Sequence, residues 1–174
     1  MGDWRNNLLF LADDGDQSTH MISSNGLAMQ VKQSANNFNL DQINLDSYQR
    51  YSTPGGYRYP DAAQDLVKRI KKGVLIFNYT GHGGEVGLTE ERILDLTTIN
   101  AFDNFNKLPL FITATCEFSR YDDPARTSAG ELCLLNPNGG AIALLTTCRV
   151  AYSNFNENLN KKVLDKLFKK MQLA

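Results

Sequence analysis

Two segments of the chain share one design, in which an apolar run of strand length ends in a small residue and then a side chain capable of catalysis. His82 follows the run 74–80 and Gly81, and Cys116 follows the run 110–115. A cysteine attacks as its thiolate, and histidine is the usual partner because it titrates near neutral pH. The two segments therefore predict nucleophilic chemistry by a cysteine–histidine dyad.

The glycines around His82 fit the same chemistry. Gly81, Gly83 and Gly84 permit a tight turn and a close approach of substrate to the backbone. The N–H groups of Gly83 and Cys116 are then candidate donors to an oxyanion. A glycine-flanked histidine or a strand-end cysteine, taken singly, is equally compatible with a structural role. It is their pairing after two similar runs that favours catalysis.

The elements that must position this pair are strands of a parallel sheet. Four buried strands are predicted, at 8–12, 74–79, 110–114 and 141–146. Their continuous apolar character, with helix patterns between them, indicates a sheet covered on both faces. A fifth strand is predicted near 42–48. Ligands of such sheets bind outside the carboxyl ends of the strands, so His82 and Cys116 are expected to face one site.

Helices and loops are predicted between and after these strands. Ala63, Leu66, Val67 and Ile70 form one apolar stripe after Pro60 and before Gly73, which predicts a helix. A terminal helix is expected over 156–171, with Leu159, Val163, Leu164, Leu167 and Phe168 on its apolar side. Segments 49–59 and 117–127 are predicted to be surface loops. His20 is interpreted as a structural or loop histidine near the start of the first helix.

Composition narrows the class of protein. The 174 residues carry a net charge of −1 and 42% hydrophobic residues, which is typical of one globular domain spanning 1–174. No basic excess supports a nucleic-acid partner, and no apolar stretch has the length of a membrane span or a secretory signal. Met1-Gly2 is compatible with the start of an internal fragment.

The cysteines and histidines give no sign of a metal site. The three cysteines, Cys116, Cys133 and Cys148, are odd in number and lack CxxC spacing, so neither a disulfide framework nor zinc ligation is indicated. Cys133 and Cys148 are interpreted as structural. With only two histidines in the chain, no His-rich metal site is expected either.

Residues 78–83 and 114–116 resemble the His-Gly and Ala-x-Cys blocks of the gingipain-type cysteine peptidases, in the caspase-like clan. The resemblance runs from 8–15 through 139–143 to Tyr152 and so covers most of the chain. Segments 116–124 and 128–131 are more similar to the type IX secretion system sortase. That sortase is a cell-surface protein that removes C-terminal sorting signals from secreted cargo and joins the new C-terminus to anionic lipopolysaccharide.

The resemblance implies a fold and a mechanism. The fold is a caspase-like three-layer α/β/α sandwich with a mostly parallel sheet in strand order 2-1-3-4-5, here as part of a larger multidomain protein. Cys116 would attack a peptide carbonyl to form an acyl-enzyme, with His82 as general acid and base. Asp14 is the best match to the acidic residue that orients the histidine, and Asp13 is the next. No cofactor is required, although the acidic turn 13–16 also suits calcium.

Specificity and location are further expectations. Gln17 stands where arginine-specific relatives carry an aspartate, so a cationic P1 side chain would lose its partner. Tyr152 matches an aromatic beside the P1 pocket, and Glu117 would oppose thiolate formation if it points toward Cys116. The implied partners are a C-terminal signal peptide of secreted cargo and the outer-membrane secretion machinery, at the cell surface. The alternative is an inactive peptidase-fold fragment that serves as a binding or scaffold domain.

Overall fold

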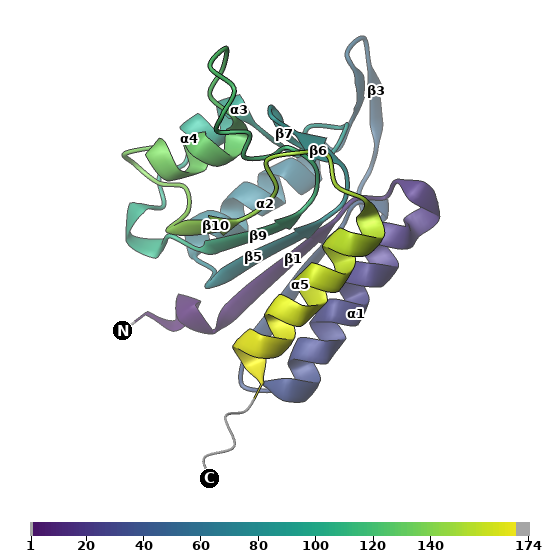
Figure 1. Ribbon diagram of the computed structural model, residues 1–174, viewed down its shortest axis with the longest axis vertical. Coiled ribbons are helices and arrows are strands. Elements are labelled where there is room, and N and C mark those ends of the chain that lie inside the picture. The colour runs from purple at the N-terminus through teal and green to yellow at the C-terminus, as the bar shows by residue number, and fades with distance from the viewer. Residues whose placement is uncertain (1, 170–174) are drawn as a thin grey trace.

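A five-stranded parallel sheet forms the centre of the molecule (Figure 1). The computed structural model describes residues 2–169. The strands lie in the order β2-β1-β5-β9-β10, and all four pairings are parallel. Their bounds are Asn7–Ala12 for β1, Asn39–Asn44 for β2, Ile76–Thr80 for β5, Leu110–Ala114 for β9 and Ala143–Leu145 for β10. Counted along the chain this order is 2-1-3-4-5, which confirms the expected topology.

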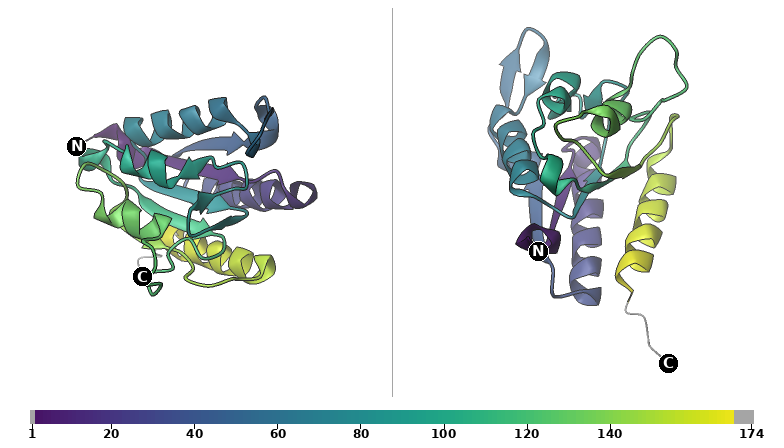
Figure 2. Two further views of the ribbon diagram at one scale, coloured as in Figure 1. Left: turned by 90° about the horizontal axis from the view of Figure 1, so that it is seen from above. Right: turned by 90° about the vertical axis from the view of Figure 1, so that its left-hand side faces the viewer.

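Helices cover both faces of the sheet. On one face lie α1 (Thr19–Ser34) and α5 (Ser153–Phe168), which run side by side in Figures 1 and 2. The other face carries α2 (Pro60–Lys72), α3 (Leu96–Asn100) and α4 (Ala129–Leu135). The three-layer α/β/α architecture is thus confirmed. Among residues 2–169, no helix combines the length and apolar character needed to cross a membrane.

Strand β1 shows why the central strands read as continuous apolar runs. Leu9 and Leu11 pack into the core shared with α2 and α4, whereas Leu8 and Phe10 pack into the core shared with α1 and α5. Successive side chains of a strand point to opposite faces. A strand covered on both sides therefore has no polar alternation.

Helix α2 begins and ends where its sequence predicts. Pro60 occupies the first turn, where its missing N–H costs nothing, and Leu66 and Ile70 are buried against the sheet. The helix stops at Gly73, whose φ of 109° favours glycine, and a Cβ there would lie 2.6 Å from the Cβ of Trp4.

Helix α5 differs from its predicted face. It begins at Ser153, and its buried residues are Asn160, Leu164 and Phe168, whereas Leu159 and Leu167 are exposed. The expectation that both leucines face the core was wrong, since the inward face is completed by the polar Asn160. Residues after 169, including the predicted end at 171, lie outside the described residues.

Three other expectations need correction. The segment 49–59 is not a plain loop, because β3 (Tyr51–Thr53) and β4 (Gly56–Arg58) pair there as an antiparallel hairpin. The fifth strand lies earlier than 42–48, since Leu45–Ser47 forms a 3-10 turn. Strand β10 is short and largely exposed because it lies at an edge of the sheet.

Short elements complete the fold. A small antiparallel sheet follows β5 and contains β6 (Gly83–Gly84), β7 (Gly87–Leu88) and β8 (Leu94–Asp95). Further 3-10 turns span Asp3–Asn6, Asp16–Ser18 and Phe105–Lys107. The small sheet places the glycines after His82 in a defined ladder, with Gly83 opposite Leu88.

Candidate active site

The loops that leave β5 and β9 are joined directly. The N–H of Gly81 donates to the carbonyl of Ala114 at 3.3 Å. A Cβ added to Gly83 would lie 2.6 Å from Oγ1 of Thr115, so only glycine allows this approach. The residues on either side of His82 thus touch the two residues that precede Cys116.

Two histidines converge on one carboxylate beside β5. Nε2 of His82 lies 3.1 Å from Oδ2 of Asp16, and Nε2 of His20 lies 3.3 Å from the same oxygen. The two rings are nearly perpendicular, with centroids 5.2 Å apart. The His82 ring is half exposed, whereas His20 is buried. Sequence reasoning treated His20 as a structural or loop residue, and it considered Asp16 only as part of the acidic turn that suits calcium, not as a partner of His82.

Each acidic residue of the turn after β1 has a different partner. Asp13 is buried, and its Oδ2 accepts from the backbone N–H of His82 at 3.0 Å. Asp14 accepts from the hydroxyl of Tyr59 at 2.5 Å. Burial, and next this hydrogen bond, raise the pKa of Tyr59 well above its usual range. The carboxylate on the His82 ring therefore belongs to Asp16 rather than to Asp14, the expected orienting residue.

The turn that presents Asp16 has an unusual backbone. Asp16, Gln17 and Ser18 have φ values of 53°, 56° and 64°, all in the left-handed region. Each such residue costs roughly 1–3 kcal/mol when it is not glycine. Packing of α1 against the sheet must therefore stabilise this turn. The turn in return keeps the Asp16 carboxylate between the two imidazoles.

A second acidic group lies behind His82. Asp13, Asp14 and Glu91 have carboxylate oxygens within 4.8 Å of one another. Burial, followed by the charges of Asp13 and Asp14, raises the pKa of Glu91. Calcium binding at the acidic turn stays a prediction, and the structure adds Glu91 to the oxygens that such an ion would meet.

Cys116 is partly buried against the segment that follows β10. Its Sγ lies 3.5 Å from both the backbone O and the backbone N of Ala151. Asn156 on α5 donates to the carbonyl of Thr115 at 3.1 Å and so braces the loop. Among residues 2–169, the Cys116 N–H has no hydrogen-bond acceptor. Cys133 contrasts with it, because burial raises the pKa of that thiol strongly.

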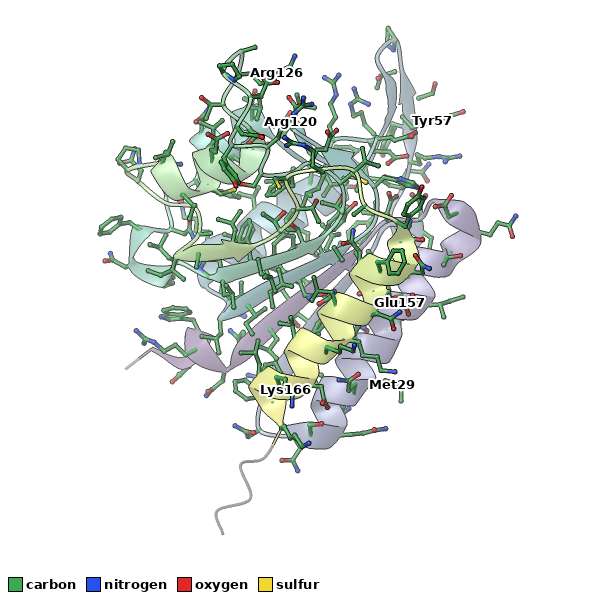
Figure 3. The ribbon with its side chains drawn as sticks, viewed as in Figure 1. Met29, Tyr57, Arg120, Arg126, Glu157 and Lys166 are labelled. Atoms are coloured by element: carbon green, nitrogen blue, oxygen red, sulfur yellow. The ribbon has the colours of Figure 1, made fainter. Side chains whose placement is uncertain are left out.

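Charges near Cys116 are held in pairs. Oε1 of Glu117 lies 3.4 Å from an Arg120 nitrogen, and that same nitrogen lies 2.7 Å from Glu85. Figure 3 shows Arg120 and Arg126 on the loop that follows β9. Asp122 of this loop binds Arg149, which lowers the pKa of Asp122 to about 2. The guanidinium of Arg120 therefore offsets the negative charge of Glu117.

The family of the chain follows from comparison with known proteins. Residues 1–174 match the sequence model of Peptidase family C25 over their whole length. The chain belongs to peptidase family C25. It is thus a member of a family of cysteine peptidases of the gingipain type. No curated protein sequence matches it.

Solved structures agree with the C25 fold. A complex of the pro- and mature domains of RgpB from Porphyromonas gingivalis aligns with a TM-score of 0.76 and 15% identity, covering 96% of this chain and 38% of that one. The Arg-specific cysteine proteinase gingipain R aligns with a TM-score of 0.73 and 17% identity, covering 94% of this chain and 37% of that one. A third structure, described only as a protease, aligns with a TM-score of 0.68 and 20% identity, covering 91% of this chain and 32% of that one. The C25 chain described here therefore spans less than two fifths of these chains.

Two residues expected to contact substrate, Gln17 and Tyr152, are exposed in this C25 chain, whereas Glu117 is partly buried. Tyr152 is 78% exposed at the start of α5, with its ring 6.3 Å from that of Phe155. Val150 is also exposed, one residue before the Ala151 that contacts Cys116. Gln17 is exposed in the turn between Asp16 and Ser18. Whether Gln17, Glu117 and Tyr152 bind substrate stays a prediction.

A large groove of the C25 chain lies away from the reactive pair. It has a volume of about 740 Å³ and runs between α1 and α5, with Ile22, Met29 and Glu157 among its lining residues. Figure 3 shows Met29 and Glu157 on these two helices. Neither His82 nor Cys116 lines this groove.

The role of Glu131 could have been found in the sequence. Ser128 and Glu131 form a capping box at the start of α4, in which Oε2 of Glu131 accepts from the Ser128 N–H at 2.8 Å. The spacing Ser-x-x-Glu is the signature of this motif. Asp16 and His20 are also four residues apart in the sequence, but Asp16 lies in the turn before α1 and not in the helix.

Proposed function

We propose that this chain is the catalytic domain of a C25 cysteine peptidase, with Cys116 as nucleophile and His82 as general acid and base. The observation that carries the proposal is the direct joining of the two loops through Gly81, Gly83 and the residues before Cys116. Family membership makes this chemistry the natural use of the pair. Neither side chain has the deep burial of the structural Cys133.

The contact with Asp16 gives the two nitrogens of His82 different roles in the proposed mechanism. When the carboxylate accepts from Nε2–H, the unprotonated nitrogen is Nδ1. In the proposed mechanism Nδ1 is the base for the thiol. The proton of Cys116 passes to Nδ1, and Sγ bonds to the peptide carbonyl carbon. The resulting imidazolium then protonates the leaving amine as the C–N bond breaks. Water, or a second amine, finally attacks the thioester and returns the free thiol.

The oxyanion of each tetrahedral intermediate needs hydrogen-bond donors. We assign this role to the N–H groups of Cys116 and Gly83. The Cys116 N–H has no competing acceptor among the described residues, and Gly83 lies in contact with Thr115. Removing one such donor typically costs about 10²–10³ in kcat.

We further propose that the substrates are C-terminal sorting signals of type IX-secreted cargo, cleaved at the cell surface with transfer of the new C-terminus to an amine. The resemblance of segments 116–124 and 128–131 to the sortase supports this reading. The exposed apolar side chains of Val150, Tyr152 and Phe155, next to the Cys116 loop, suit an extended peptide.

The first test is the pH dependence of iodoacetamide labelling, read for each cysteine by peptide mass spectrometry. Cys116 should react faster than Cys148 near neutral pH, and His82→Ala should remove this advantage. Cys148 is the internal comparison, because it is also partly exposed. Equal and slow labelling of Cys116 and Cys148 would overturn the dyad and favour the binding or scaffold alternative.

The substrate proposal needs a separate experiment. A cargo protein with its C-terminal signal is incubated with the chain and an amine acceptor, and the product mass is measured. Loss of the signal with addition of the amine supports the sortase reading, whereas addition of water alone supports a hydrolase. A Cys116→Ala variant is the control and should leave the cargo intact. No cleavage by a chain whose Cys116 is reactive would reject sorting signals as its substrates.

A further inference from the structure

The cluster of Asp16, His20 and His82 has a composition that peptide hydrolysis does not require. One carboxylate oxygen and two imidazole nitrogens lie within 4.8 Å of one another. His20 is 6% exposed, and its Nε2 makes no hydrogen bond among the described residues. A buried nitrogen without a partner is costly, and this one lies 3.3 Å from an oxygen that is also close to a second imidazole. The cluster therefore holds unused ligand capacity.

The distances from the Asp16 carboxylate to the two imidazoles match the spacing of ligands around a coordinated metal ion. Oδ2 of Asp16 lies 3.1 Å from Nε2 of His82 and 3.3 Å from Nε2 of His20. Two ligands of a tetrahedral zinc ion with bonds near 2.0–2.1 Å are about 3.3 Å apart. The two rings, at 88° to each other, approach from different directions, so each presents its Nε2 without stacking on the other.

The types of ligand select the class of ion. Imidazole nitrogens favour zinc and its transition-metal neighbours, while calcium takes oxygen ligands. Two histidines with one carboxylate leave a fourth position open, as zinc sites with three protein ligands do. The all-oxygen group of Asp13, Asp14 and Glu91 is chemically distinct from this cluster.

We propose that Asp16, His20 and His82 form a zinc-binding site that regulates the peptidase. The inhibitory part rests on the proposed role of His82. A metal ion on Nε2 of His82 leaves the neutral ring with its proton on Nδ1. That nitrogen then cannot accept the proton of Cys116, so thiolate formation stops while zinc is bound. The half-exposed His82 ring and the 60% exposed side chain of Asp16 give the ion access from solvent.

The test is a titration of the full chain with ZnCl₂ in competition with a chromophoric chelator. The wild type should bind one equivalent. Asp16→Asn and His20→Gln should each weaken binding at least about tenfold, because each replaces a strong zinc ligand with a weakly coordinating neutral amide. Asp46→Asn, which changes an exposed carboxylate elsewhere, should leave binding unchanged, as should excess calcium. Asp16→Asn keeps the test valid if the buried His20→Gln variant fails to fold.

A second measurement separates this proposal from the peptidase proposal. Iodoacetamide labelling of Cys116 is followed with and without zinc, in the wild type and in Asp16→Asn. Zinc should slow labelling in the wild type and much less in the variant. Zinc binding that disappears in Cys116→Ala would overturn the proposed ligands, because the ion would then bridge Cys116 and His82. Tight zinc binding to a chain with unreactive Cys116 would leave the metal site standing and reject only the peptidase.

Discussion

At the scale of single residues, the three aspartates of one turn do three different things. The Asp13 carboxylate accepts a hydrogen bond from the backbone N–H of His82, and that of Asp14 accepts one from the Tyr59 hydroxyl. The Asp16 carboxylate lies against the ring of His82. A carboxylate on one imidazole nitrogen sets the tautomer and the orientation of the ring. Which residue of the turn 13–16 orients the His82 ring therefore depends on the direction in which each side chain points.

Asp16→Asn should lower the rate of Cys116 labelling at pH 7 by about tenfold or more, because the imidazole loses the charge that stabilises its protonated form. Asp14→Asn is the matched control, since that carboxylate faces Tyr59 and should change the rate by less than about twofold. The rates are measured without metal, by peptide mass spectrometry. The opposite order of effects would return the orienting role to Asp14.

At the scale of elements, α5 links the sheet to the Cys116 loop. Asn160 and Asn78 of β5 exchange two buried hydrogen bonds of 2.8 and 3.2 Å. One helical turn earlier, Asn156 donates to the carbonyl of Thr115. The helix thus sets the position of the residue before Cys116 through polar contacts as well as through Leu164 and Phe168.

Asn160→Ala should lower the free energy of unfolding by about 1–3 kcal/mol, because it leaves the buried amide of Asn78 without its partner. Asn158→Ala, at an exposed position of the same helix, controls for the change in helix propensity. Denaturant unfolding of both variants measures the difference. Equal stability of the two would show that the buried pair contributes nothing net.

At the scale of the whole molecule, the acidic group behind His82 couples stability to pH. Glu91 has a raised pKa in the folded chain, because burial and the charges of Asp13 and Asp14 disfavour its ionised form. A raised carboxyl pKa means that the folded state is favoured at low pH and loses stability as the pH rises through the folded value. The loss begins above the ordinary pKa of 4.5.

Glu91→Gln should therefore raise the melting temperature at pH 7, where glutamine removes the unfavourable charge. The gain should vanish below pH 4.5, where Glu91 is protonated in both states. Glu90→Gln, at an exposed neighbouring position, should give a smaller change. Melting curves at several pH values, in buffer free of divalent ions, measure the effect. A gain that is independent of pH would exclude the ionisation of Glu91 as its cause.

The parallel sheet and the strand-end positions of His82 and Cys116 were predictable from the sequence. Burial on both faces makes each central strand a continuous apolar run, which is a local signal. Strand order came from the family resemblance. The hairpin after Gln49 and the exposed β10 were missed, because edge position and pairing depend on distant partners.

Only the tertiary structure decided what surrounds His82. Asp16 and His82 lie 66 residues apart in the chain, and they meet because β1 and β5 are neighbours in the sheet. Which aspartate reaches the ring depends on three residues in the turn that have a left-handed backbone. None of the three is glycine, so the sequence does not indicate this conformation. Local patterns thus determined which residues are capable of chemistry, while strand pairing and backbone direction determined their partners.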